Sequence, residues 1–130
     1  MTKDAQRILI VDDDASIRRI LSELTAELGL HPIEARDSNE ALAILADRVV
    51  DLALVILDLK ISGIGGEALA RAIREMPDRS DLPIVILSGA DARSLNLVAT
   101  AFQARALAKP FDLTALEREI LDALGRAPKT

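Results

Sequence analysis

Three short apolar runs constrain the fold of this chain more than any other feature of its sequence. They occupy residues 8–11, 52–57 and 84–87 and do not alternate with polar residues. A strand that buries only one face alternates, so continuous runs of this length predict strands that are buried on both faces. Such strands are typical of a parallel sheet with helices packed against both of its sides.

Segments with helical spacing lie between these runs. In five stretches, apolar residues recur at intervals of three and four, which is the spacing of one face of a helix. The stretches contain Ile17, Ile20, Leu21, Leu24 and Leu28; Leu42 and Leu45; Leu69, Ile73 and Met76; Leu95, Val98, Ala99 and Phe102; and Leu113, Leu116, Ile120 and Leu124. Two weaker strand candidates, residues 31–35 and 105–108, complete a strict alternation of strands and helices. Pro32 cannot donate to a strand ladder, so an edge position suits residues 31–35.

This alternation predicts an α/β fold: a flavodoxin-like, doubly wound sheet of five parallel strands in the order 2-1-3-4-5, with five helices. The two weaker strands are expected at the edges. A length of 130 residues fits one domain. We expect an N-terminal extension at residues 1–6, the domain at 7–125, and a tail or the start of a linker at 126–130.

Composition excludes several kinds of site and partner. The chain has no cysteine, and its single histidine, His31, cannot form a histidine metal cluster. The net charge is −5 and only two residues are aromatic, so direct binding of nucleic acid is not expected. The longest apolar run, residues 52–57, is too short to span a bilayer, and residues 1–7 lack the apolar core of a signal peptide. We therefore expect a cytoplasmic protein without membrane contact.

Polar side chains follow four of the predicted strands. Asp12 and Asp13 come after the first strand, Asp58 after the third, Ser88 after the fourth and Lys109 after the fifth. Open α/β sheets bind ligands outside the carboxyl ends of their strands, and all these residues belong to that edge. The sequence therefore predicts that they form one site.

Each of these residues alone has a plain structural explanation. An aspartate before a helix is most often an N-cap, and we interpret Asp14 in that way. An aspartate after a strand is usually a turn residue, a serine there is a loop hydroxyl, and a lysine is a solvated charge. The joint occurrence of these residues at successive strand ends favours a functional site over these separate explanations.

Clustered carboxylates repel one another unless a cation lies between them. With oxygen ligands and neither histidine nor cysteine available, the cation is expected to be hard: Mg²⁺, with Mn²⁺ as the alternative. Such a metal can neutralise charge while a carboxylate attacks a phosphoryl group. Lys109 would supply a further positive charge for a bound phosphate, and the Ser88 hydroxyl would donate a hydrogen bond to it.

These motifs resemble those of one family. Residues 8–14, residues 57–59 with Gly66 beyond them, residues 87–89 and residues 109–111 are similar to the receiver domains of response regulators in two-component signal transduction. The similarity extends from about residue 7 to residue 124. The four motifs are specific together, in this order and on matching strand ends.

The resemblance implies a role for each matching position. Asp58 would be the phospho-acceptor, taking its phosphoryl group from a phosphohistidine on a sensor histidine kinase or phosphotransfer protein. Asp13 would bind Mg²⁺ directly, Asp12 largely through water, and Asp58 and the backbone carbonyl of Lys60 would complete the protein ligands. The only chemistry implied is self-phosphorylation from a donor and autodephosphorylation, so the protein would not be an ordinary enzyme.

Ser88 and Lys109 would act on the phosphorylated state. By resemblance, Ser88 moves toward the phosphoryl oxygen on activation, Lys109 pairs with that oxygen, and the Lys109–Pro110 bond is cis. The signal would pass to a downstream output domain or to a homodimer.

Two positions depart from the family pattern. Relatives usually carry proline four residues after the acceptor, where this chain has Ser62, so we expect residues 62–66 to form a more mobile loop. Three residues before Lys109, where relatives often carry a switching aromatic ring, the chain has Ala106. The coupling of Ser88 to a buried ring cannot occur at that position.

Lys60 and Ala90 match positions that tune phosphate lifetime in relatives.

Two other functions compete with this interpretation. A haloacid-dehalogenase-type phosphatase also follows its first strand with Asp-x-Asp, here Asp12 and Asp14, and then uses Ser88 and Lys109. It requires a further acidic pair on a strand after the lysine and leaves Asp58 without a role. A pseudo-receiver would use the same fold as a binding module that is never phosphorylated.

Overall fold

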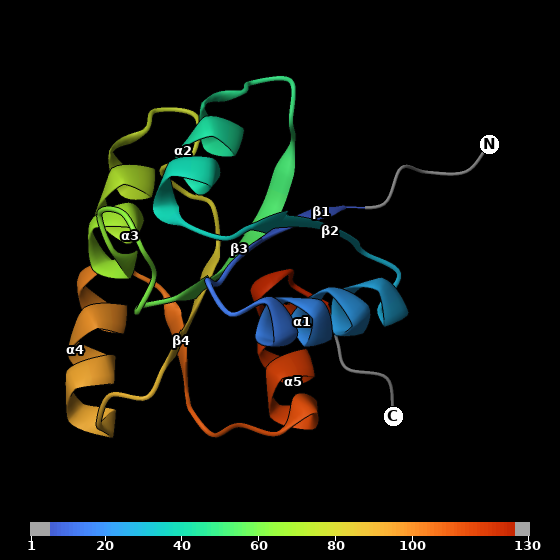
Figure 1. The fold of residues 1–130 in the computed structure, drawn as a ribbon, viewed down its shortest axis with the longest axis vertical. Coiled ribbons are helices and arrows are strands. Elements are labelled where there is room, and N and C mark those ends of the chain that lie inside the picture. Colours follow the sequence, from blue (N-terminus) through green and yellow to red (C-terminus); the bar gives the residue numbers. More distant parts are fainter. Residues whose placement is uncertain (1–5, 127–130) are drawn as a thin grey trace.

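The structure, a computed structural model, describes residues 6–126, in which strands and helices alternate without exception (Figure 1). The strands are β1 (Arg7–Val11), β2 (His31–Ala35), β3 (Leu52–Asp58), β4 (Ile84–Ser88) and β5 (Arg105–Ala108). The helices are α1 (Ala15–Glu27), α2 (Ser38–Ala46), α3 (Gly66–Glu75), α4 (Ala92–Ala101) and α5 (Leu113–Ala123). The expected extension and tail fall almost wholly outside the described residues.

The five strands form one parallel sheet in the order β2-β1-β3-β4-β5. This order confirms the predicted flavodoxin-like topology, and the two weaker strands lie at the edges. Asp58 pairs with Leu87 across β3 and β4, and Ser88 pairs with Ala108 across β4 and β5. Because the strands are parallel and in this register, their carboxyl ends lie along one edge of the sheet.

Each face of the sheet carries its own apolar core. Figure 1 shows α1 and α5 on one side of the sheet and α2, α3 and α4 on the other. On the first side, Ile8, Ile10, Leu54 and Ile56 pack with Leu21, Leu24, Leu116 and Ile120; on the second, Leu9, Val11, Val55 and Leu57 pack with Leu45, Leu69, Ile73 and Leu95. Neighbouring residues of one strand thus bury opposite faces, which explains the absence of alternation in the apolar runs.

Two arginines, the half-buried Arg74 and the buried Arg79, tie loops at the amino-terminal edge of the sheet. Arg74 donates from Nε to the Phe102 carbonyl, at 2.7 Å, and from Nη1 to the Leu82 carbonyl, also at 2.7 Å. It thereby fixes the end of α4 against the segment between α3 and β4. Arg79 donates from Nη2 to the Val50 carbonyl at 2.7 Å, closing the segment before β3.

Within residues 6–126, no helix combines the length and apolar character needed to cross a membrane.

The start of α3 packs directly against the end of β3. A Cβ atom added to Gly66 would lie 2.5 Å from the Leu59 Cα atom and 2.7 Å from the Asp58 carbonyl oxygen. Both neighbours are backbone atoms, so the added methyl group cannot be accommodated by a side-chain rotation. Gly66 therefore allows α3 to begin close to the strand end that carries Asp58.

Replacing Gly66 by Ala should lower the free energy of unfolding by about 1–3 kcal/mol, the usual cost of overpacking. Gly89→Ala provides a matched control, because nothing lies within 4 Å of a Cβ atom at Gly89. The control should change stability by less than about 0.5 kcal/mol. Urea denaturation measures both values, and equal midpoints for the two variants would contradict the close packing described here.

Candidate functional site

Three carboxylates converge at the carboxyl edge of the sheet, as the sequence predicted. One oxygen atom from each of Asp12, Asp13 and Asp58 lies within 4.8 Å of the other two. Asp12 and Asp58 are buried, with 1% and 7% of their surface exposed, whereas Asp13 is exposed to solvent. The cluster is therefore open to solvent on the side of Asp13 and enclosed by protein on the other.

The first helix fixes the loop that carries two of these carboxylates. Asp14 is the N-cap of α1, as predicted, and its Oδ1 accepts from the Ser16 amide at 2.9 Å. Its own amide donates to Oδ1 of Asp12 at 2.9 Å. The cap geometry thus sets the direction of the Asp12 side chain.

Lys109 brings a positive charge to the cluster from the end of β5. Its Nζ atom lies 3.0 Å from Oδ2 of Asp58 and 4.0 Å from Oδ2 of Asp12. The first distance is a charge-assisted hydrogen bond, whereas the second is too long for one. The other oxygen of Asp58 accepts from the Lys60 amide at 3.1 Å. Asp58 is therefore held on both oxygens.

Asp12 retains a buried oxygen without a hydrogen-bond partner among residues 6–126. Its Oδ2 atom is inaccessible to solvent and makes no hydrogen bond. Burial is the largest effect and raises the pKa of the Asp12 carboxyl; the hydrogen bond from the Asp14 amide opposes it, the negative charges of Asp58 and Asp13 act with it, and Lys109 acts against it. An unsatisfied carboxylate oxygen beside two further carboxylates fits a hard divalent cation, because such ions prefer oxygen ligands.

Ser88 is buried beside the cluster but engaged elsewhere. Its hydroxyl accepts from the Ala90 amide at 3.0 Å, and its carbonyl accepts from the Lys109 amide at 2.7 Å. Among the described residues, no hydrogen bond joins this hydroxyl to Asp58 or to the Lys109 ammonium group. The structure thus places Ser88 on the predicted edge, with its side chain turned to its own loop.

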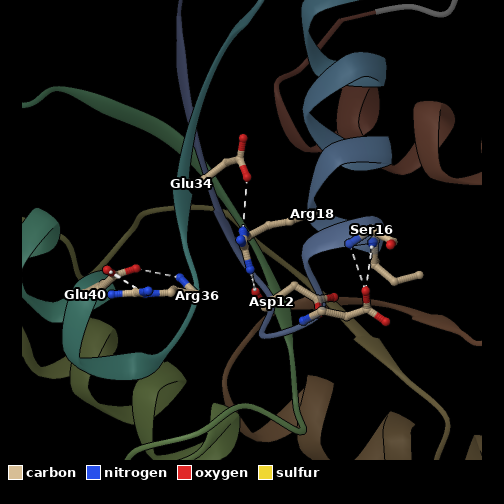
Figure 2. Close-up of polar contacts among 8 residues, drawn as sticks. Asp12, Ser16, Arg18, Glu34, Arg36 and Glu40 are labelled. Atoms are coloured by element: carbon tan, nitrogen blue, oxygen red, sulfur yellow. Dashed lines mark hydrogen bonds and ion pairs between the residues drawn. The ribbon is translucent and has the colours of Figure 1, made fainter.

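Arg18 supports the site and was not anticipated from the sequence. Figure 2 shows its guanidinium between α1 and β2: Nη1 donates to the Asp12 carbonyl at 2.8 Å, and Nε donates to Glu34 at 3.0 Å. Only 16% of the Arg18 side chain is exposed. Because one partner is a backbone carbonyl and the other lies on β2, no local sequence pattern indicates this contact.

The Lys109–Pro110 bond is cis, as the resemblance implied. Ala106 lies on β5 and packs, half-buried, against the core beneath α2, α3 and α4. His31 begins β2, where its amide donates to the Gln6 carbonyl at 2.8 Å.

Comparison with known proteins decides the family. Residues 8–121 match the model of the response regulator receiver domain. The chain belongs to this family. The receiver domain is 34% identical over 125 residues to a protein of Porphyridium aerugineum named probable transcriptional regulator ycf27, covering 95% of this chain and 50% of that protein. It is 29% identical over 121 residues to the CAI-1 autoinducer sensor kinase/phosphatase CqsS of Vibrio cholerae, covering 92% of this chain and 17% of that protein.

Solved structures agree with this assignment. The receiver domain superimposes on the chemotaxis protein CheY4 of Vibrio cholerae with a TM-score of 0.82 and 25% sequence identity, over 93% of this chain and 100% of that one. The chain spans about half the length of the ycf27 relatives, which extend beyond a receiver domain.

Replacing Asp12 by Asn should raise the stability of the metal-free protein at neutral pH. Because the pKa of this carboxyl is raised in the folded state above its ordinary value of 3.8, its ionised form opposes folding. The penalty is complete above the folded-state pKa, declines as the pH falls, and disappears below the unfolded value. Urea midpoints measured with a chelator present should therefore favour Asp12→Asn at pH 7, and the difference should shrink in acid. A variant less stable than wild type at pH 7 would refute this assignment.

Proposed function

We propose that this receiver domain is a phosphorylation-activated switch that accepts a phosphoryl group on Asp58. The donor would be a phosphohistidine on a sensor histidine kinase or phosphotransfer protein. The observation that carries the proposal is the contact between the acceptor carboxylate and Lys109, 3.0 Å away, beside two further carboxylates. A merely structural ion pair would not require Asp12 and Asp13 at the same place.

The transfer is a substitution at phosphorus. A carboxylate oxygen of Asp58 attacks the phosphorus atom, the bond from phosphorus to the histidine nitrogen breaks, and its electron pair remains on the imidazole. The product is an acyl phosphate on Asp58. The Lys109 ammonium group, already beside Asp58, then pairs with a phosphoryl oxygen. Asp12 and Asp13 take no part in bond formation.

The metal ligands would be the carboxylates of Asp12, Asp13 and Asp58 and the backbone carbonyl of Lys60. When bound, Mg²⁺ or Mn²⁺ would neutralise part of the negative charge on the phosphoryl oxygens. The buried, unpartnered oxygen of Asp12 supports this ligand set. Asp13, the exposed member, leaves the metal site accessible from solvent.

Activation would be a population shift toward a second arrangement of the same edge. The Ser88 hydroxyl now accepts from the Ala90 amide and would turn to donate to the phosphoryl group. A nearly complete shift requires about 5.5 kcal/mol of differential stabilisation. A few charge-assisted hydrogen bonds, each worth about 1.5–3 kcal/mol, are sufficient.

The names of the relatives support the proposed partners. One relative is named a transcriptional regulator and another a sensor kinase, and this chain covers only part of each. We therefore assign residues 7–125 to the receiver, working in the cytoplasm, with its signal passed to an output domain or a homodimer. The receiver itself would contact neither nucleic acid nor membrane. Its chemistry would be limited to self-phosphorylation and autodephosphorylation.

The alternative functions are weaker. A phosphatase using Asp12 as nucleophile would attack with a carboxylate that is 1% exposed and would leave the contact between Asp58 and Lys109 unexplained. A pseudo-receiver is never phosphorylated, so it would not require the contact between Asp58 and Lys109. The next experiment separates these alternatives from phosphorylation.

Incubation with a small acyl-phosphate donor and Mg²⁺ should add one phosphoryl group, detected by intact-protein mass spectrometry. Asp58→Asn should abolish the addition. Asp51→Asn, an exposed aspartate just before the opposite end of β3, is the matched control and should be phosphorylated like wild type. If wild type shows no Mg²⁺-dependent mass shift, the pseudo-receiver interpretation is correct. Turnover of a generic phosphate monoester would instead support the phosphatase.

Mg²⁺ should stabilise the folded protein, because the ligands are assembled only on folding. At ten times its Kd the ion adds about 1.4 kcal/mol, or roughly 5 °C in Tm for a domain of this size. Calorimetry with and without Mg²⁺ measures the shift. Asp13→Ala should remove most of it, and an unchanged shift in that variant would place the metal elsewhere.

A further inference from the structure

Ser38 ties α2 to the loop that follows the acceptor. It is the first residue of α2 and is fully buried. Its amide and its hydroxyl both donate to the Ser62 carbonyl, at 3.0 and 3.1 Å, and the hydroxyl accepts from the Ile64 amide at 2.8 Å. One small side chain therefore satisfies a backbone donor and a backbone acceptor of the loop between β3 and α3.

The loop is shaped around this hydroxyl. Gly63 lies between the two bonded residues and has a φ of +95°, which favours glycine. A Cβ atom at Gly63 would lie 1.9 Å from the Ser38 Oγ atom, so the backbone passes where only a hydrogen fits. From the sequence, a more mobile loop is expected here because Ser62 replaces the usual proline, and no sequence pattern indicates the contact with α2.

The turn before Ser38 is itself fixed to the site. The Asp12 amide donates to the Ala35 carbonyl at 3.1 Å. Two residues later the Asp37 side chain caps α2 by accepting from the Glu40 amide at 2.8 Å, and Figure 2 shows the Glu40 carboxylate holding Arg36. The segment between β2 and α2 thus contacts the loop of Asp12 on one side and, through Ser38, the loop after Asp58 on the other.

We infer that Ser38 is a positioning residue for the metal site. The inference rests on the proposed function, in which the Lys60 carbonyl is a metal ligand two residues before Ser62. Groups that orient a ligand typically contribute 10–100-fold to metal affinity. Ser38 sets the path of the backbone that presents this carbonyl, and it does so where a proline ring is lacking. Among the described residues, the Ser38 side chain forms hydrogen bonds with Ser62 and Ile64 and with none of the proposed metal ligands.

The test compares Ser38→Ala with Thr25→Val by calorimetric titration of Mg²⁺ into the intact chain. Thr25 is also fully buried, but its hydroxyl donates to the Leu21 carbonyl within α1, so its loss controls for general destabilisation. Ser38→Ala should weaken Mg²⁺ binding about tenfold, and Thr25→Val should leave it unchanged. Ser38→Gly removes the same hydroxyl and should reproduce the effect.

Two further measurements separate positioning from a purely structural role. Phosphorylation of Ser38→Ala should require about tenfold more Mg²⁺ than wild type to reach half of its maximal rate. At saturating Mg²⁺, the variant should be phosphorylated at nearly the wild-type rate. Hydrogen exchange at the Ile64 amide should become faster in this variant, while exchange in β1 stays slow.

The outcomes are distinct. If wild type binds Mg²⁺ and is phosphorylated, but Ser38→Ala matches it in affinity or in exchange at Ile64, the inference about Ser38 is wrong and the proposed function stands. Equal weakening by Thr25→Val also overturns it. If wild type itself neither binds Mg²⁺ nor takes up a phosphoryl group, the proposed function and this inference both fail.

Discussion

The repulsion among three carboxylates is the interaction on which the rest of this structure depends. Asp12, Asp13 and Asp58 offer oxygens within 4.8 Å of one another. Among the described residues, the one cationic side chain in an ion pair with this cluster is Lys109, 3.0 Å from Asp58 and 4.0 Å from Asp12. Like charges at this spacing oppose folding unless a cation intervenes. The apolar cores on both faces of the sheet therefore have to offset the repulsion within this cluster.

The surrounding structure limits how the cluster can relax. Arg18 holds the backbone at Asp12, the Lys109 amide joins the ends of β4 and β5, and Ser38 holds the loop after Asp58. All three contacts reach backbone atoms, so the segments that carry Asp12, Asp58 and Lys109 are each tied to a neighbouring segment. If these carboxylates bind the proposed metal ion, their fixed positions would reduce the conformational freedom lost on binding and so favour it.

The sequence predicted the fold well because its signals are local. Continuous apolar runs, helical spacing and Pro32 were enough for the order of the strands and for both edges. The convergence of Asp12, Asp58 and Lys109 was also predictable, since parallel strands place their carboxyl ends at one edge. Arg18 and Ser38 were not, because each contacts backbone atoms of a segment distant in the chain, and such contacts leave no pattern in residue type. The engagement of Ser88 with Ala90 is likewise a property of the loop conformation.

The contacts of Arg74 have a mechanical consequence for α4. This guanidinium clamps the Phe102 carbonyl at the last turn of the helix, whereas the first turn follows directly from the loop of Ser88 and Ala90. Because α4 is held at its carboxyl end, a displacement of its first turn would tilt the helix more readily than it would shift the helix along its axis. In the proposed activation, a rearrangement at Ser88 would displace the first turn of α4 and the exposed Leu97 more than Phe102, and such a movement needs no aromatic ring at the position of Ala106.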